Sequence, residues 1–116
     1  MPASPNDLLA HALLTDDLRA AAVRHLEVTA QELRVALEDG RTLTVPIAWF
    51  PRLAEGTPAE RARWELLGDG QGIHWPDLDE DILLASLLAG RRSGESPASL
   101  ARWRTALAQA RASRAG

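Results

Sequence analysis

Cysteine and lysine are both absent from this chain of 116 residues, and no apolar run approaches the ~20 residues that a membrane-spanning helix requires. Without cysteine the chain has no disulfide, no thiolate metal site and no thiol nucleophile. The first residues also lack the basic and apolar regions of a secretory signal. We therefore expect a cytoplasmic protein without membrane contact, built as one domain around a single core.

All 13 basic residues are arginines, and they are unevenly placed along the chain. Residues 1–90 contain 7 arginines against 15 acidic residues, whereas residues 91–116 contain 6 arginines against Glu95 alone. A basic tail on an acidic body can contact nucleic acid, through candidate residues Arg91, Arg92, Arg102 and Arg104. A solvated, arginine-rich helix would explain the same charges without any partner.

The hydrophobic periodicity divides the chain into three parts. Residues 1–21 read as an N-terminal helical extension, because Ser4 can cap a helix and Pro5 suits its first position. Residues 22–90 mix alternating and helical patterns, as expected of an α+β domain. Residues 91–116 read as a linker followed by a basic C-terminal helix that starts at 96–97.

Alternating apolar residues within 22–47 predict a three-stranded antiparallel meander with one wet face. A three-residue loop at 38–40 would pair Leu33 with Val45 and Val35 with Leu43, so that their side chains share one face. Gly40 would then take the left-handed position of a bulged turn.

The remaining signals predict several short helices and one further strand. They comprise a helical turn at 49–53, a capping box at 57–60 that opens a helix ending at 64–66, a glycine-rich turn at 68–72, a short strand at 73–75, and a helix capped by Asp79 or Asp81 and closed by Gly90. The expected fold class is therefore α+β. It consists of a small antiparallel sheet (the meander plus a short strand) packed with several short helices, with the C-terminal helix appended.

Ordered motifs in the middle of the chain resemble those of the domain of unknown function 2442 family over roughly residues 22–90. The motifs are Asp39-Gly40-Arg41, Val45-Pro46, Trp49-Phe50-Pro51-Arg52-Leu53, Thr57-Pro58-Ala59-Glu60-Arg61, Trp64-Glu65-Leu66 and Gly72-Ile73-His74-Trp75-Pro76-Asp77-Leu78-Asp79-Glu80-Asp81-Ile82. The resemblance implies a small bacterial α+β protein without an established activity. It also implies a small protein partner of the domain of unknown function 4160 family, in a toxin–antitoxin-like pair.

Some members of that family carry a C-terminal helix-turn-helix. Residues 91–116 hold one predicted helix, which is too few for that DNA-binding unit. Nucleic-acid binding therefore remains an alternative that rests on the arginines of the tail.

The densest polar cluster is His74 with the acids at 77, 79, 80 and 81. Imidazole and carboxylates could hold a metal, and a metal-dependent or hydrolytic enzyme centred on His74 is a further alternative. Helix capping by the acids, with His74 bonded to a carboxylate or carbonyl, explains the same residues without a ligand. We assign no catalytic residue, no metal ligand and no cofactor.

Aromatic residues beside arginines are enriched in protein interfaces. The leading hypothesis is therefore a non-catalytic protein-interaction or regulatory module. Its expected contact residues are Trp49, Arg52, Arg61, His74, Trp75 and Asp77. Several amphipathic helical segments on one small sheet also leave room for a homodimer.

Overall fold

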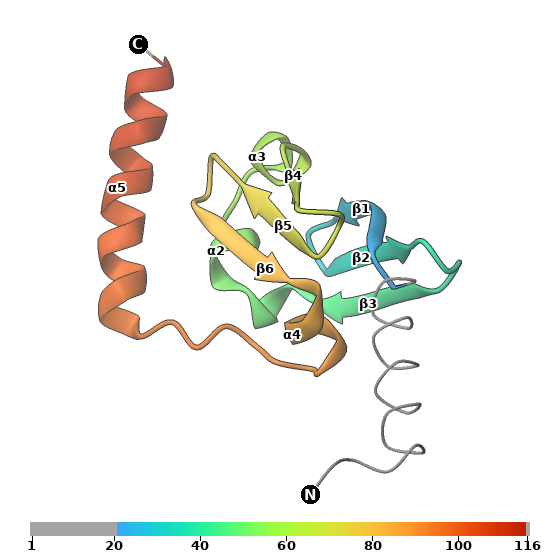
Figure 1. Cartoon of the computed structure of the whole chain (residues 1–116). Coiled ribbons are helices and arrows are strands. Elements are labelled where there is room, and N and C mark those ends of the chain that lie inside the picture. Colours follow the sequence, from blue (N-terminus) through green and yellow to red (C-terminus); the bar gives the residue numbers. More distant parts are fainter. Residues whose placement is uncertain (1–20, 116) are drawn as a thin grey trace, which may run out of the picture.

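The first sheet contains three consecutive strands in the order β1–β2–β3: β1 (Val23–Val28), β2 (Glu32–Leu37) and β3 (Thr42–Pro46). The computed structural model describes residues 21–115 of the chain (Figure 1). The predicted register is confirmed, with Leu33 opposite Val45 and Val35 opposite Leu43. Gly40 has a φ of +92° in the connecting turn, as the bulged loop requires.

Three short helical segments follow the meander: η1 (Ile47–Trp49), α2 (Pro51–Ala54) and α3 (Pro58–Ala62). The capping box at the start of α3 is confirmed. The Thr57 hydroxyl accepts from the Glu60 backbone N–H at 3.2 Å, and the Glu60 carboxylate accepts from the Thr57 N–H at 2.9 Å. The prediction that this helix continues to 64–66 is wrong, because residues 65–67 pair as a strand instead.

The second sheet has the order β4–β5–β6: β4 (Glu65–Leu67), β5 (Gly72–Trp75) and β6 (Glu80–Leu83). The sequence predicted only the middle strand, as an addition to the first sheet. It also placed a helix from Asp79 or Asp81 to Gly90. A helix is present at 84–88, but its predicted start is wrong, because residues 80–83 form a strand. Asp79 adopts a left-handed conformation with a φ of +49°, and this turn lets residues 80–83 return antiparallel to β5.

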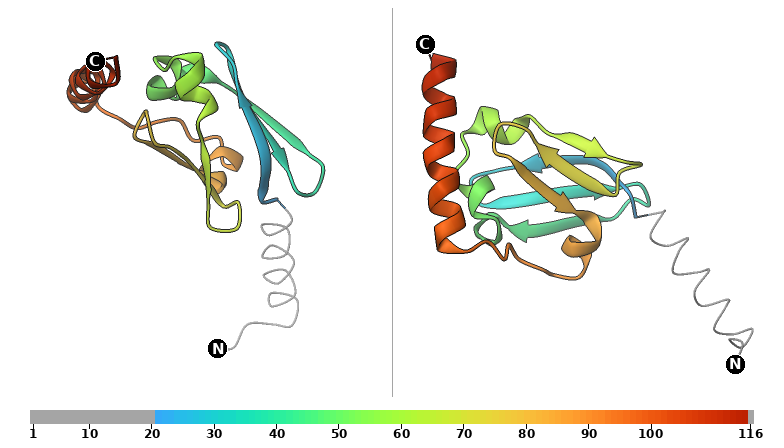
Figure 2. Two further views of the ribbon diagram at one scale, coloured as in Figure 1. Left: turned by 90° about the horizontal axis from the view of Figure 1, so that it is seen from above. Right: turned by 60° about the vertical axis from the view of Figure 1, so that its left-hand side comes forward.

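Helix α4 (Leu84–Leu88) begins directly after β6, and no side chain caps it. An extended linker then leads to α5 (Pro97–Ala115), which stands at one end of the two sheets (Figure 2). Trp103 and Leu107 are the buried residues of this helix, and the Trp103 indole N–H donates to the carbonyl of Leu78 at 2.7 Å. The predicted N-terminal helix lies outside the described residues.

One hydrophobic core lies between the two sheets, which face each other as two layers (Figure 2). Leu33 and Val35 enter it from the first sheet, and Ile73 and Trp75 enter it from the second. The α+β class is thus confirmed, with two small sheets instead of one. Among residues 21–115, no helix is both long and apolar enough to cross a membrane.

Candidate functional site: the outer face of the second sheet

The outer face of the β4–β5–β6 sheet is set by strand alternation. Ile73 and Ile82 are paired across the sheet and buried, so their neighbours in sequence point outward. The register then places two rows on the outer face. One row is Leu67–Gly72–Leu83, and the other is Glu65–His74–Asp81.

The first row is an exposed apolar strip, which we call the leucine row (Leu67, Gly72, Leu83). A Cβ added to Gly72 would lie 3.3 Å from Cδ2 of Leu83 and 3.4 Å from Cβ of Leu67, so the two leucines close over the glycine from both sides. Leu83 is 58% exposed and Leu67 is 37% exposed. A strand position that faces water usually carries a polar residue, which makes this row unusual.

The second row is polar. Nδ1 of His74 forms a short contact with the Asp81 carboxylate, and Glu65 lies opposite His74 on the other side. The hydrogen bond with Asp81 raises the pKa of the His74 imidazole above its ordinary value. His74 therefore gains positive charge more readily than an isolated histidine. The geometry explains its position without a bound ligand.

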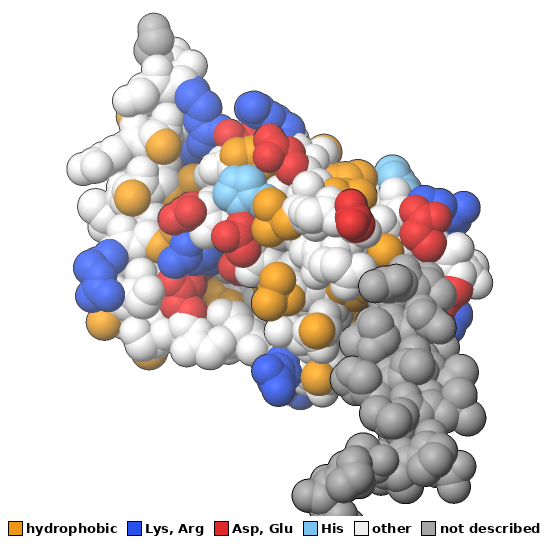
Figure 3. All heavy atoms as spheres, in the orientation of Figure 1, with side chains coloured by type: hydrophobic (Ala, Val, Ile, Leu, Met, Phe, Trp, Pro, Cys, Tyr) orange, Lys and Arg blue, Asp and Glu red, His pale blue; other side chains and the backbone are white. Residues whose placement is uncertain are grey.

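Exposed acidic side chains lie in and beside the rows: Glu65 and Asp81 belong to the second row, and Asp69 lies in the turn between β4 and β5. Residues 64–90 contain six acidic residues and no arginine or lysine. The face turned to the viewer in Figure 3 shows hydrophobic side chains, red acidic groups and a histidine side by side over β5 and β6. The outer face therefore combines exposed apolar area with a negative potential.

The sequence-predicted interface residues do not lie together on this face. Trp75 is fully buried on the inner side of β5, and its indole N–H donates to the Arg61 carbonyl at 3.1 Å. Arg61 is itself buried, at 8% exposure. Trp75 is in the interior because strand alternation in β5 turns its side chain toward the core, so it cannot touch a partner of the folded domain. Arg61 lies in α3 and is not an exposed contact on this face. Only His74 of the predicted set belongs to the outer face.

Arg52 is fixed by contacts within the chain. Its guanidinium forms a two-point ion pair with Glu95 and lies 5.4 Å from the ring centre of Trp103. It also donates to the carbonyl of Asp79 at 2.6 Å. Arg52 thus ties α2 to the linker and to the β5–β6 turn, which is a structural role.

Trp49 contacts the linker that precedes α5, and Asp77 contacts helix α5 itself. Trp49 is half-buried, and the Arg92 guanidinium lies 4.8 Å from the centre of its ring. Asp77 follows β5 and pairs with Arg63 at 3.2 Å and with Arg114 at 3.3 Å. As contact residues for a partner, Trp49, Arg52, His74 and Asp77 stay predictions.

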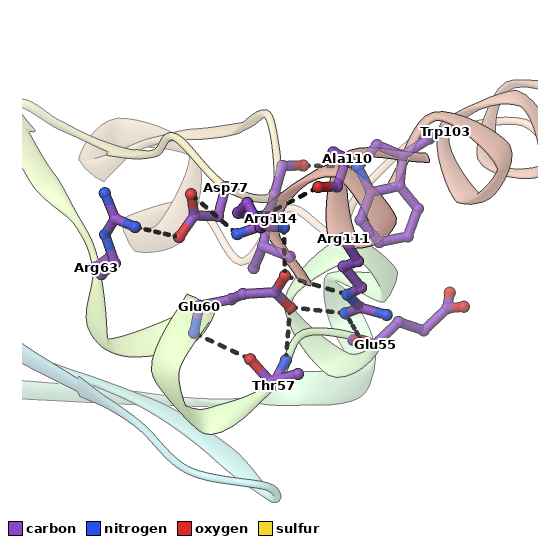
Figure 4. Close-up of polar contacts among 10 residues, drawn as sticks. Glu55, Thr57, Glu60, Arg63, Asp77, Trp103, Ala110, Arg111 and Arg114 are labelled. Atoms are coloured by element: carbon purple, nitrogen blue, oxygen red, sulfur yellow. Dashed lines mark hydrogen bonds and ion pairs between the residues drawn. The ribbon is translucent and has the colours of Figure 1, made fainter. Parts of the chain in front are cut away.

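Three of the four arginines of α5 pair with carboxylates of the domain, and Figure 4 shows two of them, Arg111 and Arg114. The Glu60 carboxylate is almost fully buried and accepts from Arg111 at 2.6 Å and from Arg114 at 3.0 Å. Arg111, the Thr57 N–H and Arg114 lower the pKa of Glu60 to about 2, against the opposing effect of burial. Arg104 pairs with Glu55 at 2.6 Å. The basic helix thus neutralises acids of its own domain.

These contacts bear on the nucleic-acid alternative. Of its four predicted residues, Arg104 is held by Glu55 and Arg92 by the ring of Trp49. Arg91 and Arg102 are exposed, and within residues 21–115 neither forms an ion pair. Nucleic-acid binding stays a prediction that rests mainly on these two arginines.

Within the described part of the chain, no group of three or more histidine, cysteine, aspartate and glutamate side chains is placed to hold a metal ion. The acids around His74 are spread along β6 and its preceding turn, where only Asp81 contacts the imidazole. Sequence reasoning missed Leu67 and Leu83. Residues 80–83 were read as helical, and Leu67 fell between the predicted helix that ends at 64–66 and the glycine-rich turn at 68–72. Residues 65–67 show no alternation of polar and apolar residues, so the sequence carries no signal for this strand.

The fold and this face define the class of protein. It is a small α+β domain of two facing antiparallel sheets, with an exposed leucine row and a C-terminal helix that ion pairs hold to the domain. Residues 20–93 match the family described as "Protein of unknown function (DUF2442)". The chain belongs to this family, as its motifs predicted. No curated protein matches the chain.

Two solved structures are similar to it. A protein of unknown function from Rhodospirillum rubrum is 28% identical, with a TM-score of 0.56, over 64% of this chain and 92% of that one. An uncharacterised protein from Chromobacterium violaceum is 24% identical, with a TM-score of 0.58, over 88% of this chain and 95% of that one. The second supports the fold alone.

Proposed function

We propose that this protein is a non-catalytic protein-interaction module that binds a small basic protein partner through the outer face of the β4–β5–β6 sheet. The observation that carries the proposal is the leucine row, with Leu83 more than half exposed. A regulatory, antitoxin-like role with a partner of the domain of unknown function 4160 family is part of the proposal and follows from the family.

The energetic argument begins with apolar area. Each Å² of apolar surface removed from water contributes about 25 cal/mol, so covering two leucines would favour binding by a few kcal/mol at most. Such residues form the centre of an interface, and polar neighbours form its rim. Leu67 and Leu83 converge over Gly72 in this arrangement, with His74 and Asp81 beside them.

The charge of the face selects the partner. Glu65, Asp69 and Asp81 are exposed around the leucine row, and no arginine lies in residues 64–90. A basic partner would be attracted at long range, and an acidic one would be repelled. A second copy of this face is equally acidic, so a homodimer through it is disfavoured, while a homodimer through another face stays a prediction.

The test begins with mass spectrometry of the untagged protein, purified gently from its own host at native abundance. We expect one small basic protein in stoichiometric amount. The Leu83→Asp variant should lose that partner, because a buried unpaired charge at the centre of an interface opposes binding.

The matched control is Thr44→Asp, which places the same charge at an exposed position of β3 on the other sheet. Circular dichroism should show both variants folded. Partner loss in Leu83→Asp alone supports the proposal. Equal partner retention in both variants, or recovery of the chain without any protein, would refute it.

A further inference from the structure

Arg61 is a buried cation without a counter-charge. It is 8% exposed, and its Nε has no hydrogen-bond partner. Within residues 21–115 its guanidinium forms no ion pair, whereas Arg52, Arg104 and Arg111 each pair with a carboxylate. Arginine is almost never buried without a partner, because removing an unpaired charge from water is costly.

The fold holds Arg61 in this position through its backbone and stem. Its carbonyl accepts from the Trp75 indole, which is fully buried. A Cβ added to Gly56 would lie 3.3 Å from Cγ of Arg61, so the stem packs closely against this glycine. The buried position of the Arg61 side chain is therefore fixed by the packing of the domain.

Arg61 lines a cleft of about 490 Å³ between β1 and the α3–β4 connection. Leu26, Val28 and Trp64 supply much of its wall, and His25 meets the Trp64 ring edge-on at 5.6 Å between centres. The remaining lining is mixed, with Ala62 as an apolar residue and His25, Glu27, Thr29 and Arg61 as polar ones. A concave site of this size that combines apolar walls with polar groups suits a small organic molecule.

We infer that this cleft binds a carboxylate on a compact aromatic or aliphatic body, with the Arg61 guanidinium as its charged donor. The planar guanidinium matches a carboxylate through two parallel hydrogen bonds. The apolar body would lie against Trp64 and Leu26. This inference is independent of the proposed function, because the leucine row lies on the outer face of the β4–β5–β6 sheet and none of its residues lines the cleft.

The local charge favours a monoanion over a phosphate. Among the residues that the structure describes, Arg61 is the one arginine that lines the cleft, and Glu27 lines it as well. Glu27 is partly neutralised by Arg34 at 3.8 Å, outside the cleft lining. The Glu27 carboxylate repels either ligand, but the single positive charge of Arg61 balances a carboxylate, whereas it neutralises only about half of the charge of a phosphate with nearly two negative charges.

The probe is 3-phenylpropionate, added to the full-length ¹⁵N-labelled protein, with 3-phenylpropionamide as the neutral match. The signals to follow are the Arg61 Nε–Hε and the Trp64 indole N–H. We expect saturable shifts of both signals with the acid at millimolar concentration and none with the amide. A peptide that ends in phenylalanine, compared with its amidated form, tells whether the carboxylate of a protein chain end binds as well.

Arg61→Met keeps the apolar stem and removes the charge, and it should weaken binding by about tenfold or more. Arg63→Met is the matched control at an exposed arginine and should leave binding unchanged. Should Arg61→Met fail to fold, Trp64→Leu keeps Arg61 and should weaken binding several-fold. Identical shifts with acid and amide, or an unmoved Arg61 signal in the wild-type titration, would overturn the inference.

Discussion

The Glu60 carboxylate should be the main electrostatic anchor of helix α5. Glu60→Gln removes its charge but keeps an oxygen that can accept from the Thr57 N–H, so the capping box of α3 survives. The two hydrogen bonds from Arg111 and the bond from Arg114 then lose their ionic character. The change therefore isolates the ion pairs from the local helix structure.

The pKa of Glu60 gives the size of the effect. It falls from an ordinary value of 4.5 to about 2 in the folded domain, and this difference corresponds to about 3 kcal/mol of stability. Arg111 and Arg114 are 39% and 41% exposed, so water weakens the interaction. We expect Glu60→Gln to lower the free energy of unfolding by about 1–3 kcal/mol at neutral pH.

The pH dependence follows from the sign of the shift. A lowered pKa stabilises the folded state fully above the ordinary value of 4.5, and this stabilisation is lost as the pH falls toward 2. Urea unfolding of both proteins, followed by tryptophan fluorescence, measures the difference. Near pH 3 the difference in the free energy of unfolding between the wild type and Glu60→Gln should be less than half of its value at neutral pH.

The matched control is Glu55→Gln, whose solvent-exposed pair with Arg104 should contribute much less to stability than the buried Glu60 carboxylate. The Trp103 indole signal reports in parallel whether α5 stays docked. An equal loss for Glu60→Gln and Glu55→Gln, or a gap that does not change with pH, would show that Glu60 does not anchor the helix electrostatically.

Three further predictions concern single groups. Gly70→Ala should lower the stability of the folded domain by more than about 2 kcal/mol in thermal unfolding, because φ at Gly70 is +84° and the new Cβ would lie 2.6 Å from a backbone oxygen. Gly40→Ala, at φ +92° but in open space, should lower it by about 1 kcal/mol. Asp81→Asn should lower the pKa of His74 toward its ordinary value in an NMR titration, and an unchanged pKa would refute the pairing. Burial raises the pKa of the Glu80 carboxyl from 4.5 to about 7, so the folded state loses stability as the pH rises from 4.5 to about 7. Glu80→Gln should therefore raise the melting temperature near pH 8 but leave it unchanged near pH 4.

The sequence was sufficient for the first sheet and for α5, because both carry long periodic signals. The alternation from Leu33 to Val45 determines which residues face the core, and the loop at Gly40 then determines the register. The buried residues of α5, Trp103 and Leu107, are four positions apart, which is the spacing of one helix face.

The second sheet could not be predicted, because its strands are only three or four residues long. Asp79 and Asp81 have high propensity for helix caps, yet Asp79 turns the chain in a left-handed conformation and Asp81 pairs with His74. Pairing with β5 outweighs the local signal. The outer face was therefore missed as well, since its rows exist only once three separate segments lie side by side.

The contacts of α5 have a consequence for the order of folding. Each sheet consists of hairpins between neighbouring segments, whereas Arg111 reaches a residue 51 positions earlier in the chain and Arg114 one 54 positions earlier. Contacts with a long sequence separation form late, because closing a long loop costs entropy before any contact rewards it. The two hairpin layers should consequently assemble before the helix docks. In reverse, release of the helix should be the first step of unfolding. It would leave Glu60 without Arg111 and Arg114, and Asp77 with Arg63 alone.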